Sequence, residues 1–283
     1  GGRSIVCRES LTELTSAIAM SRCDDKRITH NVLTSAGLVM PEQLLLGAAP
    51  LSNSQRVELE AFLERHGSLV VKPARGEQGH GVAVGLRRLE DVEFAIESAR
   101  KFCEEIIIEQ KMAGDDLRIV VIDHQVVAAA IRRPAEIAGD GVHDIASLID
   151  KQSRRRAAAT AGESRIPLDG ETERCVAEAG FSMSSVLPLG QRLAVRKTAN
   201  LHTGGTLTDV TERLHPVLRD VAERASRALD IPVTGLDLMV KDPTEPDYAI
   251  IEANERPGLA NHEPQPTAER FIDLLFPQTR SLP

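Results

Sequence analysis

The apolar positions of the chain follow two spacings, one typical of β-strands and one typical of amphipathic α-helices. Branched and apolar runs predict strands at 38–46, 68–73, 81–86, 105–110, 116–123, 125–134, 192–197, 234–242 and 247–258. Apolar residues three or four positions apart predict helices at 25–36, 52–66, 89–103, 143–153, 171–179, 216–229 and 267–277. Hairpins are more frequent than regular strand–helix–strand units, so we predict a mixed α+β fold and not a plain doubly wound sheet.

Local sequence features mark some boundaries of these elements. Ser52 is followed three residues later by Gln55, which is the capping-box pattern, and Gly67 ends the same helix. The segment 153–164 is rich in small and polar residues and predicts a mobile loop. An apolar patch at 11–20 predicts a short helix or a docking segment.

The composition is that of an ordinary soluble globular protein. Hydrophobic residues make up 42% and charged residues 27% of the 283 residues, enough for one large domain or two lobes. The net charge of −8 and the aromatic content of 2% argue against nucleic acid as the main partner. The sequence has no membrane-length apolar run, no signal peptide and no paired cysteine spacing, so we expect a cytoplasmic protein with reduced thiols.

The most informative feature is a β-hairpin near the C-terminal end of the sequence. A symmetric turn places Asp237 directly opposite Glu252. The same face carries Met239 opposite Ile250, and Asn254 lies two residues beyond Glu252. Two facing carboxylates repel each other unless a cation lies between them, and Mg²⁺ held by two carboxylates and an amide oxygen would resolve the conflict. A solvent-exposed hairpin edge is the alternative.

A glycine-rich segment joins two of the predicted strands. Gly76, Gly79 and Gly81 would let backbone N–H groups turn inward around an anion, and Lys72 lies at the preceding strand end. A hairpin loop that only needs positive φ explains these glycines at least as well. The loop runs from strand to strand, which excludes the Walker and Rossmann loops, because both of those open a helix.

Basic residues and a second glycine loop supply further candidate anion contacts. These candidates are Arg132, Arg133, Arg196, Asn200, Gly204 and Gly205. Adjacent strand residues point to opposite faces, so at most one residue of each basic pair reaches a given site. A solvated turn explains the second glycine loop nearly as well. Together with the carboxylate pair, these features favour nucleotide-dependent phosphoryl chemistry, in which the protein positions the reactants and neutralises charge.

Several segments carry a resemblance to the ATP-grasp ligases. They read CDDKRITHNVLTSAGLVMP, VVKPARGEQGHGV, IIIEQKMAGDDLRIVVID, and GLDLM followed by IIEANERPG. The segment RKTANLHTGGTLTDVTERLHP is similar to the ligase modules of cyanophycin synthetases and of bacterial fusion-type glutathione synthetases. The chain as a whole most resembles the N-acetylglutaminylglutamine synthetase family, in which an ATP-grasp module follows an acetyltransferase-like half.

The resemblance implies an ATP-grasp fold, with the nucleotide bound between two α+β lobes. It implies an N-terminal segment at 1–25, a lid lobe at 26–109 and a core lobe at 110–283 that contains the metal hairpin. The implied nucleotide contacts are Lys26, Lys72, Gly76, Gly79, Gly81, Glu109, Gln110, Met112 and Asp116. The implied catalytic residues are Lys72 and Arg196, and the implied metal ligands are Asp237, Glu252 and Asn254. The implied substrate contacts are Arg132, Arg133, Asn200, Gly204 and Gly205.

The reaction implied by the resemblance is ATP-dependent amide formation from small amino-acid or N-acyl amino-acid substrates. A carboxylate attacks the γ-phosphate of ATP in complex with Mg²⁺, for which Mn²⁺ can substitute, and an amine then attacks the acyl phosphate. N-acetylglutaminylglutamine is the expected product. Glutathione-like or cyanophycin-like products, or a nucleotide-binding module without catalysis, are the alternatives. A homo-oligomer and a covalently joined upstream acetyltransferase-like domain are left open.

Overall fold

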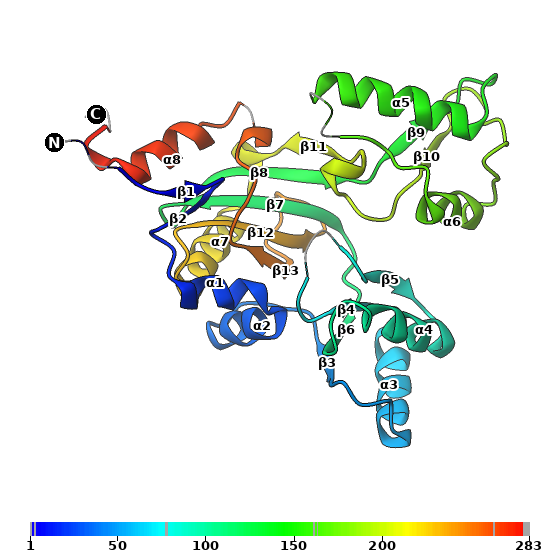
Figure 1. Cartoon of the computed structure of the whole chain (residues 1–283), viewed down its shortest axis with the longest axis horizontal. Coiled ribbons are helices and arrows are strands. Elements are labelled where there is room, and N and C mark those ends of the chain that lie inside the picture. Colours follow the sequence, from blue (N-terminus) through cyan, green and yellow to red (C-terminus); the bar gives the residue numbers. More distant parts are fainter. Residues whose placement is uncertain are drawn as a thin grey trace. The chain divides into compact units, whose positions relative to one another are not determined.

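The computed structural model describes residues 2, 4–76, 79–160, 162, 164–262 and 264–279. The chain forms two compact units, one made of Gly1–Ala130 with Asp209–Pro283 and the other of Ile131–Thr208 (Figure 1). Helices and antiparallel strand pairs are mixed along the sequence, which confirms the predicted α+β class. The lobe boundaries expected near residues 25 and 109 stay a prediction.

One sheet has the strand order β11-β8-β7-β12-β13, and most of its residues belong to the larger unit, whereas β8 from Ile131 and β11 up to Thr208 belong to the smaller unit. The strands of this sheet are β7 (Asp115–Ile122), β8 (Gln125–Arg133), β11 (Thr206–Asp209), β12 (Val233–Val240) and β13 (Tyr248–Asn254). β12 pairs antiparallel with β7 on one side and with β13 on the other. The strand that carries Asp237 is therefore interior to the sheet, and all of its residues except Met239 are buried.

Helices of the larger unit cover this sheet with their apolar faces. They are α1 (Ala17–Asp24), α2 (Lys26–Ser35), α7 (Pro216–Leu229) and α8 (Thr267–Leu275). α7 contacts β7 and β12, whereas α1 and α2 contact β13. α8 contacts β7, and its Phe271 packs on a cluster that contains Val120 and Ile122. The short elements of this unit are β1 (Cys7–Arg8), β2 (Leu11–Thr12), η2 (Thr211–Arg213), η3 (Ala260–His262) and η4 (Pro277–Thr279).

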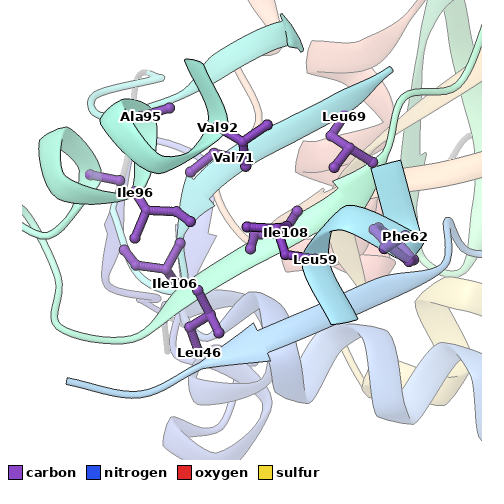
Figure 2. Close-up of a cluster of buried hydrophobic side chains, with 11 residues drawn as sticks. Leu46, Leu59, Phe62, Leu69, Val71, Val92, Ala95, Ile96, Ile106 and Ile108 are labelled. Atoms are coloured by element: carbon purple, nitrogen blue, oxygen red, sulfur yellow. The ribbon is translucent and has the colours of Figure 1, made fainter. Parts of the chain in front are cut away.

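A second, four-stranded sheet of the larger unit has the order β3-β6-β4-β5 and is antiparallel throughout. Its strands are β3 (Gln43–Leu46), β4 (Leu69–Pro73), β5 (Ala83–Leu86) and β6 (Ile106–Gln110), and its helices are α3 (Asn53–His66) and α4 (Leu89–Ala99). Figure 2 shows the core between them, where Phe62 and Leu59 of α3 and Ile96 of α4 meet strand residues such as Ile108. This core fixes the position of β4 and β6, which carry Lys72 and Glu109.

The smaller unit is built around a short antiparallel strand pair and two helices. Its elements are β9 (Glu136–Ala138), β10 (Arg192–Ala194), α5 (Ile145–Ala159), α6 (Gly170–Glu178) and η1 (Leu201–Thr203). Ile137 and Leu193 from the strands, Ile149 from α5 and Val176 from α6 form one buried cluster. This unit therefore has a hydrophobic core of its own.

Some predicted boundaries are wrong for identifiable reasons. α5 continues to Ala159 through the basic and alanine-rich run that we predicted to be a loop, because alanine and arginine are strong helix formers. Residues 161 and 163 of the predicted loop lie outside the described residues. The patch at 11–20 contains β2 and only the start of α1, because Ser16 caps α1 with its side chain. In the described part of the chain, every helix is too short or too polar to cross a membrane.

Candidate active site

The hairpin of β12 and β13 brings the two predicted carboxylates together. Asp237 pairs with Glu252 across the strands, which confirms the predicted register at this point. The predicted pairing of Met239 with Ile250 is wrong, because a bulge follows Asp237 and shifts Met239 opposite Ala249. The pairing predicted from a symmetric turn is therefore correct for Asp237 with Glu252, and is wrong between the bulge and the turn.

Asp237 is paired with an arginine that we did not predict from the sequence. Arg118 on β7 lies directly opposite Asp237, with Nε 2.5 Å from Oδ1, and its Nη2 donates a hydrogen bond to Oδ2 at 3.2 Å. Asp237 is 7% exposed, so the guanidinium supplies a buried counter-charge. A single arginine within the apolar run of β7 was the sequence feature that could have identified it. Which strand lies beside β12 could not be read from that run.

Glycine at position 235 makes room for this guanidinium. A Cβ atom built on Gly235 would lie 2.6 Å from Nη1 of Arg118 and 2.9 Å from Cβ of Pro257. Both distances are too short for ordinary contact. The Gly235 position therefore permits the Arg118–Asp237 ion pair.

Glu252 is paired with Lys26, the first residue of α2. Nζ of Lys26 lies 3.2 Å from Oε1 of Glu252 and donates a hydrogen bond to the carbonyl oxygen of Gly76 at 2.8 Å. The backbone N–H of Lys26 donates to the carbonyl oxygen of Ala74 at 3.0 Å. Asp25 caps α2 by accepting a hydrogen bond from the backbone of Arg27. The helix start thus places the Lys26 side chain between the glycine loop and the hairpin.

Asn254 completes the predicted set of metal ligands. Its Nδ2 donates to the backbone carbonyl oxygen of Gly235 at 3.3 Å. The backbone carbonyl oxygen of Asn254 accepts from Oγ1 of Thr234 at 2.9 Å. Two carboxylates and an amide oxygen are hard oxygen donors of the kind that Mg²⁺ prefers. Glu252 already has a cationic partner in the ammonium of Lys26. Across the described ranges, no group of three or more His, Cys, Asp and Glu side chains could hold a metal ion, so the predicted set depends on the amide of Asn254.

Lys72 and Glu109 form a buried ion pair. They lie on the neighbouring strands β4 and β6, and Nζ of Lys72 is 2.6 Å from Oε1 of Glu109. Lys72 is 5% exposed and Glu109 is 4% exposed. Two charges removed from water to this degree stabilise the fold only when they stay paired. The carboxylate of Glu109 therefore fixes where the Lys72 ammonium lies.

The segment predicted to bind the adenine edge already uses part of its backbone. The N–H of Gln110 donates to the carbonyl oxygen of Glu42 at 2.9 Å, and the N–H of Lys111 donates to that of Ser68 at 3.1 Å. Met112 follows and is half-buried. Asp116, the predicted ribose contact, lies on β7 opposite Met239. The nucleotide roles of these residues stay predictions.

The glycine loop has the backbone geometry that we predicted. Gly76, Gly79 and Gly81 have φ values of +136°, +77° and +73°, in the region that favours glycine. The ring of His80 stacks on Phe102, with centroids 6.0 Å apart. Residues 77 and 78 lie outside the described residues, and binding of an anion by the loop stays a prediction.

Arg196, in the smaller unit, is held by acidic side chains from the start of α6. Its Nη1 lies 2.5 Å from Oδ1 of Asp169, and its Nη2 lies 2.9 Å from Oε2 of Glu171. Its Nη1 also lies 3.2 Å from Oγ1 of Thr172. The Arg196 side chain is 7% exposed. The side chain predicted to steady a phosphoryl group is thus ordered by carboxylates in this structure.

The second glycine loop is a tight turn in the smaller unit. The N–H of Gly205 donates to the carbonyl oxygen of Asn200 at 2.9 Å, and Oδ1 of Asn200 accepts from the N–H of His202 at 2.9 Å. Gly204 has a φ of +93°, and a Cβ atom there would lie 2.4 Å from Ile166. The glycines are therefore required by packing, whatever else they do.

A cavity of about 240 Å³ in the smaller unit brings two predicted substrate contacts together. Arg133 and Gly204 both line it. Its other polar lining residues are Glu136, Gln152, Arg192 and Thr206. Arg132, the neighbour of Arg133, is half-buried and is not part of this lining.

The arrangement of these elements is the ATP-grasp fold. Residues 44–147 match the family model of the prokaryotic glutathione synthetase ATP-grasp domain. A crystal structure of a bifunctional glutathione synthetase from Pasteurella multocida aligns with a TM-score of 0.63 at 24% identity, covering 94% of this chain and 38% of that chain. The predicted fold is therefore confirmed.

Two curated relatives are similar along nearly the whole chain. Cyanophycin synthetase of Trichormus variabilis is 31% identical over 287 residues, which is 96% of this chain and 31% of that protein. The bifunctional glutathione biosynthesis protein of Desulfotalea psychrophila is 30% identical over 272 residues, which is 93% of this chain and 34% of that protein. The chain thus spans about a third of the length of these relatives. The expected relationship to both groups is confirmed, and the closer one to N-acetylglutaminylglutamine synthetases stays a prediction.

Proposed function

We propose that this chain is an ATP-dependent carboxylate–amine ligase that forms an amide bond through an acyl phosphate. The observation that carries the proposal is the pairing of Asp237 with Glu252 on β12 and β13, each carboxylate accompanied by one cationic side chain. Its support is the ATP-grasp fold and the similarity to cyanophycin synthetase and to a glutathione biosynthesis protein.

The chain's own residues would bind and orient a nucleotide. Lys26 and Lys72 would neutralise phosphate oxygens, and Lys72 is held at one position by Glu109. Asp237, Glu252 and Asn254 would hold Mg²⁺, which supplies charge neutralisation at the phosphates when it is bound. Solved ATP-grasp relatives include a D-alanine–D-alanine ligase complexed with ATP and the ligase PsnB complexed with Mg and ADP.

The reaction then needs no covalent enzyme intermediate. A substrate carboxylate oxygen attacks the γ-phosphorus of ATP and ADP leaves. The amine of the second substrate attacks the acyl carbon, and phosphate leaves from the tetrahedral intermediate. Arg196 would stabilise the negative charge that develops on the phosphoryl oxygens, which requires it to exchange its contacts with Asp169 and Glu171.

The substrates that we propose are an N-acetylglutamine-type carboxylate donor and glutamine as the amine. Arg133 would contact an amino-acid carboxylate bound in the cavity that it lines together with Gly204. Other amino-acid substrates are the second candidate, and it is favoured by the 31% and 30% identities to cyanophycin synthetase and the glutathione biosynthesis protein.

The test is ADP release from Mg-ATP with amino acids and N-acetyl amino acids, supplied singly and in pairs, with mass detection of products. The proposal expects ADP only when a donor and an acceptor are both present, together with the mass of the amide product. Asp237→Asn and Glu252→Gln should lower turnover at least about a hundredfold with an unchanged circular dichroism spectrum. ADP release that is unchanged in the double variant would remove the metal assignment.

A further inference from the structure

The ammonium of Lys26 occupies a position between two groups that the proposed reaction requires. It lies 3.2 Å from the carboxylate of Glu252 and donates to the carbonyl oxygen of Gly76 at 2.8 Å. The Lys26 side chain is 12% exposed and that of Glu252 is 34% exposed. The cation is therefore partly shielded from water by the hairpin and the glycine loop.

Each of the two hairpin carboxylates already has one cationic side chain beside it. Asp237 is paired with Arg118 and Glu252 with Lys26, so two carboxylates face two cations. A divalent cation that enters alone would bring excess positive charge to Glu252 while Lys26 remains there. Binding of the metal by Glu252 is thus in competition with Lys26.

Lys26 is the cation that can leave. Arg118 makes two contacts with Asp237, and the side chains of that pair are 15% and 10% exposed. Lys26 makes one contact with Glu252, and its flexible side chain can turn toward another anion. The phosphates of a nucleotide, bound beside the loop that contains Gly76, would be such an anion.

We propose that Lys26 is the counter-ion of Glu252 in the ligand-free protein. It prevents a divalent cation from binding to Glu252 until the phosphates of a nucleotide pair with the lysine instead. Lys26 thereby makes metal binding depend on the nucleotide. This inference rests on the proposed function, because it assumes that Glu252 is a metal ligand. It assigns to Lys26 a role in the ligand-free protein in addition to its contact with phosphate.

The test is Mn²⁺ binding without nucleotide, measured by electron paramagnetic resonance of free Mn²⁺ in the wild type and in Lys26→Met. We expect Mn²⁺ to bind the variant about fivefold more tightly, since the competing ion pair is gone. Lys26→Gln should show the same gain, and Lys26→Arg should keep the weak binding of the wild type. Thermal unfolding of each variant checks that it is folded.

A matched control separates this effect from a general change in charge. Lys241 follows β12, and its side chain is 80% exposed, so Lys241→Met removes the same charge without touching Glu252. An equal gain in Lys241→Met, or wild-type affinity in both Lys26→Met and Lys26→Gln, would overturn the inference. Adding Glu252→Gln to Lys26→Met should abolish the gain, and a gain that persists would also overturn it.

The two proposals fail in different ways in this experiment. If the wild type binds Mn²⁺ and the Lys26 variants bind it equally well, only the inference about Lys26 is lost. If neither the wild type nor any Lys26 variant binds Mn²⁺ at millimolar concentration, both the inference and the metal assignment of the proposed function are overturned.

Discussion

At the scale of single residues, Asp237 has one neighbour that is close to it in the sequence and one that is distant. Asp237 and Glu252 lie on consecutive strands joined by a single loop at 241–247, so their pairing could be predicted from alternation and the position of the turn. Arg118 lies far from both in sequence and reaches Asp237 only through the pairing of β7 with β12. That pairing depends on how the whole sheet assembles, and no motif of the sequence encodes it.

Replacement of Arg118 by methionine should destabilise the fold. Asp237 would keep a buried negative charge opposite Glu252, so we expect the free energy of unfolding to fall by about 3 kcal/mol. Urea denaturation without divalent cations measures this change. Arg192→Met is the control, because it breaks the exposed pair of Arg192 with Glu136 and should cost less than about 1 kcal/mol. Equal losses in the two variants would contradict the prediction.

The cysteines should differ sharply in reactivity. Burial raises the pKa of the Cys23 thiol to about 12, and the carboxylates of Glu255 and Glu252 add to the rise. A raised pKa keeps the thiol protonated at pH 8, and the protonated form is unreactive. Cys7 is exposed. We expect a disulfide reagent at pH 8 to modify Cys7 first and Cys23 only after denaturation. Peptide mapping identifies the sites, and rapid modification of Cys23 in the folded protein would contradict this.

At the scale of elements, boundaries with a local cause were predictable and those set by packing were not. Ser52 and Gln55 form the predicted capping box, and Gly67 ends α3 in the left-handed conformation. The bulge after Asp237 has no such marker, because it arises where β13 fits beside a strand already paired on its other side. The length of α5 was also missed, since small residues favour a loop and a helix alike.

The glycine loop offers a matched pair of substitutions. A Cβ atom at Gly81 would lie 2.8 Å from the ring of Phe102, whereas no atom of the described residues lies within 4 Å of one at Gly79. Both residues have positive φ, so alanine should cost about 1 kcal/mol at either position. We expect Gly81→Ala to cost roughly 1 kcal/mol more, because the ring must also move. Thermal unfolding of both variants measures the difference, and equal losses would show that contact with Phe102 is unimportant.

At the scale of the whole molecule, each predicted site residue can be assigned to one of the two units. Lys26, Lys72, Asp237 and Glu252 belong to the larger unit, and Arg196 belongs to the smaller unit. The resemblance of the motifs to ATP-grasp ligases predicted the fold over nearly the whole chain. The identity of the substrates could not be predicted in the same way, because an arginine side chain can pair with any carboxylate of suitable size.

This division predicts that nucleotide binding and turnover can be separated. Arg196→Met changes only the smaller unit, so we expect turnover to fall at least about a hundredfold while the Kd for ATP changes less than about threefold. Isothermal titration and ADP release measure the two quantities. Arg174→Met, which removes an exposed arginine of α6, should leave both unchanged. A loss of ATP binding in Arg196→Met would place the arginine in the nucleotide site instead.

The packing of β13 against the segment before β3 also has a spectroscopic consequence. The chain has one tyrosine and no tryptophan. That residue, Tyr248, is the first of β13, four residues before Glu252, and its hydroxyl accepts a hydrogen bond from the N–H of Val39 at 3.3 Å. Tyrosine emission from the intact protein therefore comes from one known place on β13. Ligands that displace this strand would be detected by native fluorescence, without any attached dye.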